Sequence, residues 1–494
     1  MSKLLRGGRL SAVREDVAKF TSSMKDDLRL AEAVIAINKA HVIMLMEQKI
    51  LKQEDGVKLL QALAKCSCAA FDASAEDVHM AVEEVVLKEV GETVGGNLHI
   101  AKSRNDQVAT AIRMELRKDL LTLMRAVAHV QEHLIEVAED HLKTVILEYT
   151  HLQPAQPVTF AHYLLSHCTA LERDLERLQN VYSRVNLCPL GAGALATTSF
   201  PINRERTAAL LGFSGVAENS IDAVGSRDFV TETLAVLTLI AVNLSRFAED
   251  FIIWSSPDFG MVELPDEFAS TSSIMPQKKN PEVLEVIRAR ATNVLGDFVA
   301  AAAAVKSLPS TYNLDFQEIT PKLWASIETV RASLDMLHKL LPKLKVTQDV
   351  AGKANASFVA ATELANLLVR KYSVPFRTAH KIVGAFVKAL IGAQRTFAEA
   401  TPEMLQKAAE NVANIKLTVK TEELKALADP LALVEACKVE GGPAPGVVKR
   451  ALDEWKEKLL HTKSHILQLD KLLEKAENDL EAAVASYFSE KRKT

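Results

Sequence analysis

Glycine and proline are scarce in this chain of 494 residues, which contains 19 glycines and 16 prolines. Together they make up about 7% of the chain, whereas about 12% is usual. So few turn-forming residues disfavour a β-sandwich and a collagen-like fibre, and a hydrophobic fraction of 48% excludes a wholly disordered chain. This length corresponds to about three domains. The composition therefore predicts a helical globular protein.

The chain also lacks an excess of charge that would attract a polyanion. It contains 59 Lys and Arg residues against 63 Asp and Glu residues, a formal net charge of -4. We therefore expect a small molecule or another protein as partner, and neither nucleic acid nor a membrane. The longest apolar run, between Glu232 and Arg246, is shorter than the ~20 residues that span a bilayer, so it indicates a buried helix.

Cysteines are few and follow no metal or redox pattern. The five cysteines are an odd number, no Cys-x-x-Cys pair occurs, and no apolar signal segment is found at the N-terminus. These features predict free thiols and a reducing, cytoplasmic location.

Long helical patterns fill much of the chain. Apolar residues between 116 and 137 recur at alternating steps of four and three, which predicts a helix packed against partner helices. A second seam, from 452 to 487, predicts a long helix at the C-terminus. Two stretches between 232 and 305 are apolar almost all round, as expected for the centre of a large bundle that continues into another subunit.

Two short motifs match known site patterns but are more simply structural. His129 to His133 spells H-x-x-E-H, a zinc-peptidase pattern, yet both histidines flank the apolar seam and no acidic third ligand follows. Gly191 to Ala196 matches the dinucleotide pattern G-x-G-x-x-A, but Pro189 disfavours the buried strand that such a site needs. We therefore expect neither a metal site nor a nucleotide site.

Three dense polar segments, too polar for a core, are the strongest functional signal: residues 95–113, 148–162 and 270–281. In the first, Arg104 can bind a carboxylate bidentately, and Asn105 and Asp106 follow it. The plainer interpretation is a capped helix N-terminus. The two interpretations are compatible, because a helix N-terminus also attracts anions.

The other two segments place acid–base and cationic groups together. In the second segment, the hydroxyl of Thr150 is next in sequence to His151, and histidine is the side chain that titrates near neutral pH. A lone histidine is nevertheless more often structural. Ser272 and Ser273 lie a short loop away from Lys278 and Lys279, in a segment that ends at Pro281. A solvated charge pair is the plainer interpretation of the lysines, but the apolar residues between them and the serines disfavour it.

These segments resemble the three signature regions of the fumarase/aspartase superfamily. In detail they are similar to those of argininosuccinate lyases, because the third region reads Met275-Pro276-Gln277-Lys278-Lys279-Asn280-Pro281. Supporting segments, among them Arg6-Gly7-Gly8-Arg9, extend the resemblance from residue 6 to about residue 450. The resemblance implies reversible cleavage of argininosuccinate to arginine and fumarate by an amidine lyase of arginine biosynthesis, without cofactor or metal.

The resemblance also implies an all-α architecture of three helical domains. We expect an N-terminal domain of residues 1–108, a central bundle of residues 109–360 and a C-terminal domain of residues 361–494. Four chains are expected to assemble as a homotetramer around a core of about 20 helices. Each active site would then draw residues from three chains.

Roles for individual residues follow from the same resemblance. Ser272 and His151 match the acid–base pair of the family; we favour Ser272 as the base, and the opposite assignment stays open. Lys278 and Asn280 would stabilise the aci-carboxylate formed when the carbon-bound proton leaves. The residues expected to bind substrate, besides Lys278, are Ser23, Arg104, Asn105, Thr150, Arg227, Tyr312 and Gln317.

Several positions depart from the pattern of the family. Thr271 and Glu148 replace usual glycines, and a common lysine contact falls on Thr320, with Lys322 nearby. Ile100-Ala101-Lys102 replaces the usual Thr-Gly-Arg. Further replacements are Val34 for Asp, Ile37-Asn38 for Gly-Ser, and Cys437 for arginine.

Two other functions stay open. The chain could be another lyase of the superfamily, such as an adenylosuccinate lyase, although Gln277-Lys278-Lys279 disfavours this. It could also be a noncatalytic structural homologue like the lens crystallins. The presence together of Thr150, His151, Ser272, Lys278 and Asn280 favours activity.

Overall fold

The bundle at the centre of the molecule is built on the heptad seam of residues 116–137. In the computed structural model, which describes residues 14–72, 74–347 and 350–489, this seam lies on α6 (Arg104–Asp140) and is buried or nearly so. Five long helices form the bundle: α6, α7 (Phe160–Val185), α10 (Asp228–Trp254), α11 (Glu282–Val305) and α12 (Phe316–Leu340). The predicted all-α fold is confirmed, and the segment Arg6-Gly7-Gly8-Arg9 lies outside the described residues.

The apolar run between Glu232 and Arg246 lies within α10, which is buried over much of its length. None of the helices in the described ranges has the length and apolar character needed to cross a membrane.

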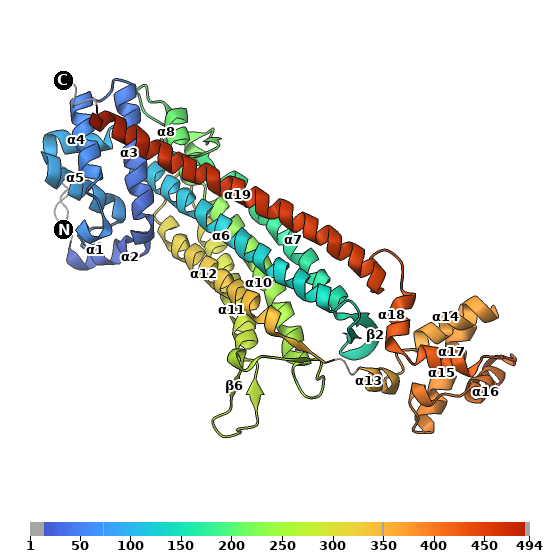
Figure 1. Ribbon diagram of the computed structural model, residues 1–494. Coiled ribbons are helices and arrows are strands. Elements are labelled where there is room, and N and C mark those ends of the chain that lie inside the picture. Colours follow the sequence, from blue (N-terminus) through green and yellow to red (C-terminus); the bar gives the residue numbers. More distant parts are fainter. Residues whose placement is uncertain (1–13, 73, 348–349, 490–494) are drawn as a thin grey trace.

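A helical lobe precedes the bundle at one end (Figure 1). It contains α1 (Glu15–Thr21), α2 (Met24–Asp27), α3 (Ala31–Glu47), α4 (Gln53–Leu63) and α5 (Val78–Gly95), with 3-10 turns η1 (Leu28–Leu30), η2 (Cys68–Ala70) and η3 (Gly96–His99). Two short helices connect bundle helices: α8 (Arg204–Leu210) and α9 (Ser220–Gly225).

A second, smaller lobe lies at the other end of the bundle (Figure 1). Its helices are α13 (Ala351–Ala356), α14 (Ala361–Tyr372), α15 (Phe376–Gly392), α16 (Pro402–Ala413), α17 (Thr421–Leu427) and α18 (Pro430–Ala436). A 3-10 turn, η6 (Phe397–Glu399), lies among these helices. Two other 3-10 turns, η4 (Asp266–Phe268) and η5 (Leu341–Lys343), precede the second lobe in the chain.

Strands are short and form four two-stranded pairs among the described residues. β1 (Val145–Thr150) and β2 (Gln153–Thr159) make an antiparallel hairpin, as do β6 (Ser270–Thr271) and β7 (Lys279–Asn280). The other pairs are β3 (Leu187–Cys188) parallel to β4 (Gly215–Val216), and β5 (Val262–Glu263) antiparallel to β8 (Lys345–Val346). They serve as connections rather than as a sheet core.

The last helix, α19 (Pro445–Ser489), returns along the bundle to the first lobe, as the red ribbon of Figure 1 shows. It confirms the long helix predicted from the second seam, whose Leu452, Leu459 and Ile466 are buried. A row of ion pairs joins it to α6: Lys456–Glu139, Lys463–Glu132, Asp470–Arg125 and Glu477–Lys118. Each surface pair stabilises weakly, but together they fix the register of the two helices. The predicted division into three domains stays a prediction.

Candidate active site

One cavity brings together most of the residues predicted to bind substrate. It lies between the first lobe and the adjacent end of the bundle and has a volume of about 360 Å³. Six of the eight predicted binding residues line it: Ser23, Arg104, Asn105, Arg227, Tyr312 and Gln317. The cavity thus joins segments that are almost 300 residues apart in the sequence.

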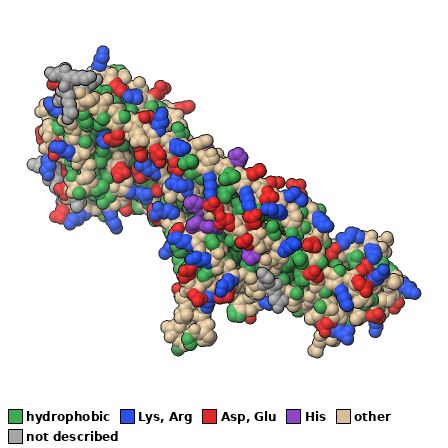
Figure 2. All heavy atoms as spheres, viewed as in Figure 1, with side chains coloured by type: hydrophobic (Ala, Val, Ile, Leu, Met, Phe, Trp, Pro, Cys, Tyr) green, Lys and Arg blue, Asp and Glu red, His purple; other side chains and the backbone are tan. Residues whose placement is uncertain are grey.

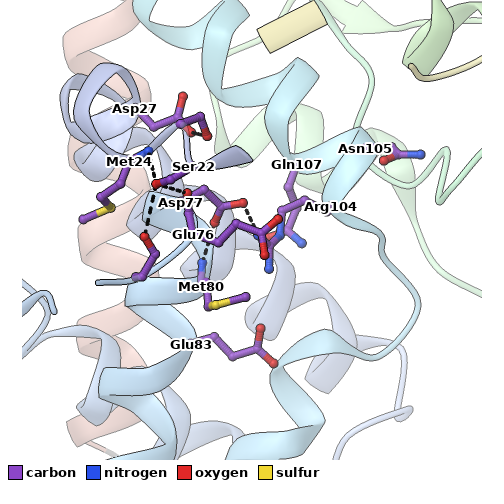
Figure 3. Close-up of polar contacts among 12 residues, drawn as sticks. Ser22, Met24, Asp27, Glu76, Asp77, Met80, Glu83, Arg104, Asn105 and Gln107 are labelled. Carbon is purple, nitrogen blue, oxygen red and sulfur yellow. Dashed lines mark hydrogen bonds and ion pairs between the residues drawn. The ribbon is translucent and has the colours of Figure 1, made fainter. Parts of the chain in front are cut away.

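The first polar segment starts α6 at the wall of this cavity. Ser103 and Asp106 form a capping box: the Asn105 N–H donates to Ser103 Oγ at 3.3 Å and the Ser103 N–H to Asp106 Oδ1 at 3.0 Å. Arg104, which follows the cap, forms an ion pair with Asp77 (Figure 3). The start of α6 is therefore both a capped helix N-terminus and part of the cavity wall, so both interpretations of the first polar segment hold.

Asp106, to which sequence reasoning gave no binding or catalytic role, ties a distant loop to this helix start. Its Oδ2 accepts the N–H groups of Gly191 at 3.0 Å and Gly193 at 2.8 Å. Both glycines have positive φ, and a Cβ on Gly193 would lie 2.6 Å from the carbonyl oxygen of Thr197. The dinucleotide-like pattern therefore binds an internal carboxylate. Burial raises the pKa of Asp106 to about 6, against the lowering effect of the three N–H groups.

Arg227 lines the cavity and has unpaired hydrogen-bond donors in its buried guanidinium. Its side chain is buried over Phe316, with 4.5 Å from the guanidinium carbon to the ring centre. Nη1 donates to the carbonyl oxygens of Val224 and Ser226, whereas Nε and Nη2 are buried without a partner. Burial lowers the pKa of Arg227 to about 10, so the group stays charged at neutral pH. Unpaired, buried donors on a cationic side chain favour binding of an anionic group, such as a carboxylate.

Carboxylates line another part of the same cavity, and sequence reasoning gave them no role. They are Asp26, Asp27, Glu76 and Asp77. Asp77 caps α5 by accepting the Met80 N–H at 2.8 Å, and Ser23 donates to Asp27. Burial is the main cause that raises the pKa of Asp27 to about 6. With guanidinium groups and carboxylates together, the cavity suits a ligand that carries both signs of charge.

The position at which the family commonly has a lysine contact also lies in the wall of this cavity, and here it is Thr320. Thr320 lines the cavity and donates its hydroxyl to the Phe316 carbonyl oxygen at 3.2 Å. Lys322 is not among the lining residues. No lysine therefore replaces the missing contact from α12.

Thr150 and His151 lie at the tip of the β1–β2 hairpin, near the opposite end of α6. The 37 residues of α6 span about 55 Å, so the hairpin is far from Arg104. His151 and Leu152 form a two-residue turn with φ of 55° and 56°, the left-handed pair of a type I′ turn. Such angles are costly for residues other than glycine and are found at functional sites. Both side chains are exposed.

The third polar segment forms a hairpin that extends away from the bundle, below β6 in Figure 1. Ser272 Oγ accepts the N–H groups of Ile274 at 3.3 Å and Met275 at 3.2 Å. Lys279 pairs with Asp266 at 2.6 Å, whereas Lys278 is exposed and forms no ion pair with the residues that the structure describes. About 40 Å of helix α10 separates this hairpin from Arg227.

The histidines of the H-x-x-E-H pattern pack against a third histidine. The rings of His129 and His133 lie 5.5 and 4.5 Å from that of His338, centre to centre, and His133 Nδ1 is 2.7 Å from Glu136 Oε2. Histidines also gather in the middle of the face in Figure 2. Within the described ranges no group of three His, Cys, Asp or Glu side chains could hold a metal ion.

Comparison with known proteins gives the family. A family model described as Lyase matches residues 9–296, and one described as Argininosuccinate lyase C-terminal matches residues 358–435. The argininosuccinate lyase of Methanocaldococcus jannaschii is 44% identical over 92% of this chain and 94% of its own length. That of Methanosarcina mazei is 43% identical over 99% of both.

Solved structures agree with this result. A structure of EDDS lyase in complex with formate has a TM-score of 0.89 at 32% identity, over 94% of each chain. A class II fumarase from Schistosoma mansoni, at 15% identity, shares the fold over 82% of this chain and 90% of its own, with a TM-score of 0.69. The chain belongs to the argininosuccinate lyase family of the fumarase/aspartase superfamily.

Proposed function

We propose that this protein catalyses the reversible anti elimination of argininosuccinate to L-arginine and fumarate, a step of arginine biosynthesis. The cavity carries this proposal, because it combines the unpaired donors of Arg227 and the guanidinium of Arg104 with four carboxylates. Argininosuccinate needs both kinds of group, since it bears three carboxylates, an ammonium and a guanidinium. The near full-length similarity to proteins named argininosuccinate lyase supports the same reaction.

In the proposed mechanism Ser272 takes the proton from the carbon next to a substrate carboxylate. Its Oγ accepts two loop N–H groups, which favours an alkoxide and so a stronger base. The resulting aci-carboxylate is stabilised by Lys278 and Asn280. The electron pair of the cleaved carbon–nitrogen bond leaves with the guanidino nitrogen, which takes a proton from His151. No step uses a metal or a cofactor.

The remaining contacts hold the substrate. Arg104 and Arg227 bind carboxylates, and Ser23, Asn105, Tyr312 and Gln317 donate or accept hydrogen bonds around them. Thr150 acts beside His151 from the hairpin tip. Fumarate release follows once the loop of residues 270–281 opens.

A homotetramer completes the site in this proposal. Within one chain, the cavity is separated from His151 by the length of α6 and from Ser272 by that of α10. Five large apolar side chains are exposed on α10 and α11, which fits burial between copies: Leu239, Val242, Val286, Leu295 and Val299. Each site would take the cavity from one chain, Thr150 and His151 from a second, and Ser272, Lys278 and Asn280 from a third.

We further propose a cytoplasmic location, in keeping with the unpaired cysteines, and helical domains of residues 1–108, 109–360 and 361–494. The helix-breaking segments near residues 100 and 350 support these boundaries.

An assay with argininosuccinate tests the reaction. Fumarate formation is followed by its ultraviolet absorbance, with adenylosuccinate as the control substrate. We expect turnover of argininosuccinate alone, and Ser272→Ala should abolish it. Release of fumarate only from adenylosuccinate, or from neither compound, would refute the proposal in favour of another lyase or a structural homologue.

Mixing two inactive variants tests the shared sites. His151→Asn and Ser272→Ala tetramers, dissociated and reassembled together, contain some sites with neither substitution. We expect partial recovery of activity in the mixture and none in either variant treated alone. Persistent inactivity of a mixture that contains hybrid tetramers would refute the three-chain site.

A further inference from the structure

A buried lysine, Lys102, directly precedes the cap of α6. Its side chain and that of Asn38 on α3 are 8% and 3% exposed, and Lys102 Nζ donates to Asn38 Oδ1. Asn38 Nδ2 in turn donates to the Val34 carbonyl oxygen at 2.8 Å. Lys102, Asn38 and Val34 are all positions at which this chain departs from the pattern of its family, and they form one hydrogen-bonded chain.

The turn that carries Lys102 is fixed at a second point. His41 on α3 places Nε2 2.7 Å from the Ile100 carbonyl oxygen. Ala101, between these two anchors, has a φ of 61°, which is costly for a residue other than glycine. Two contacts to α3 therefore hold a strained turn in place. Arg104 and Asn105, which line the cavity, begin the helix two residues later.

Ionisable groups face Lys102 from every element around it. Asp106 on α6 and Glu83 on α5 favour its charged form, and Arg104 opposes it. Burial lowers the pKa of Lys102 to about 7. Burial also lowers the pKa of His41 and His79 to about 3 and that of His99 to about 4, so these three are neutral near pH 7. Lys102 is thus the cation of this cluster whose charge changes near neutral pH.

We propose that Lys102 and Asn38 form a positioning pair for Arg104 and Asn105, and that the charge of Lys102 strengthens binding of the substrate carboxylate at the start of α6. The hydrogen bond fixes where the helix begins, and the ammonium adds positive potential behind Arg104. This proposal rests on the proposed function of the cavity. Lys102 does not touch substrate, because it is not among the residues that line the cavity.

The test compares KM and kcat for argininosuccinate between about pH 6 and pH 8.5 in the wild type and variants. In the wild type, KM should rise as pH increases through neutrality, because Lys102 loses its charge. Lys102→Met should raise KM at low pH by roughly three- to tenfold with a smaller effect on kcat. Lys102→Arg, which keeps a charge at every pH, should keep KM low above neutrality.

Asn38→Asp gives an independent result if Lys102→Met does not fold. A carboxylate beside Lys102 favours its charged form, so the rise in KM should move to higher pH. Leu59→Ala, in the core of the first lobe, is the control for lost stability and should leave KM unchanged. Equal pH profiles in all variants, with only unfolding temperatures altered, would show a structural role and overturn the proposal. A wild type that releases no fumarate would overturn the proposed function as well, and so the two failures are distinguishable.

Discussion

Replacement of Asp106 by asparagine tests what holds the start of α6 in the cavity wall. Asp106 is completely buried, and its two oxygens accept three backbone N–H groups, from Ser103, Gly191 and Gly193. Asparagine has the same shape but only one acceptor oxygen. It can keep both glycine bonds only if its NH₂ group turns toward the Ser103 N–H, where two donors then face each other.

The cost follows from these contacts. Losing one charge-assisted bond and leaving a buried donor unpaired costs about 1–3 kcal/mol. We expect Asp106→Asn to lower the free energy of unfolding by about 1–3 kcal/mol, measured by urea unfolding followed by circular dichroism. KM for argininosuccinate should also rise, because Arg104 and Asn105 depend on this cap.

Asp140→Asn is the matched control, since it makes the same substitution at the exposed C-terminal end of the same helix. Loss of a negative charge at that end of the helix should leave the free energy of unfolding unchanged or raise it slightly, by no more than about 0.5 kcal/mol. If Asp106→Asn unfolds at the same urea concentration as Asp140→Asn, Asp106 is not the anchor that its three hydrogen bonds indicate.

Three other substitutions have expected outcomes. Arg227→Met should raise KM about 10- to 100-fold without loss of stability, because it removes a buried, partly unpaired cation; a less stable protein with normal KM would contradict this. Ala101→Gly should raise the free energy of unfolding by up to about 1 kcal/mol by relieving a positive φ, and an unchanged urea midpoint would argue against strain. The pKa of His41 is about 3 in the folded protein and 6.5 when unfolded, so its contribution to stability decreases as pH falls below 6.5, by up to about 5 kcal/mol. His41→Gln should therefore move acid unfolding, followed by circular dichroism, to lower pH.

The fold was predictable where the pattern is local. The seam of residues 116–137 specified a bundle helix because alternating steps of four and three residues put one apolar face along a helix, whatever it packs against. The seam of residues 452–487 specified a long final helix in the same way. It did not specify that this helix returns along α6 to the first lobe, because its partners on α6 lie more than 300 residues away in the sequence.

The candidate site was predicted as three polar segments and a set of binding residues, and six of these residues line one cavity. The residues that were missed are carboxylates. Asp27 and Asp106 lie near helix ends, where a lone acidic residue is usually a cap. What distinguishes Asp106 is a pair of N–H groups that lie 85 and 87 residues further along the chain. No local pattern contains that information.

The length of α6 links the fold to the proposed reaction. Its first residues line the cavity, and its last residues lead into the hairpin of Thr150 and His151, about 55 Å away. A straight helix cannot bring its own two ends together, and so in the proposed reaction each end would serve a different site. The ion pairs with α19 and the buried seam keep α6 in register and so fix the distance between those sites. In the proposed tetramer, packing of the bundle would therefore set the geometry at which neighbouring chains supply the missing residues.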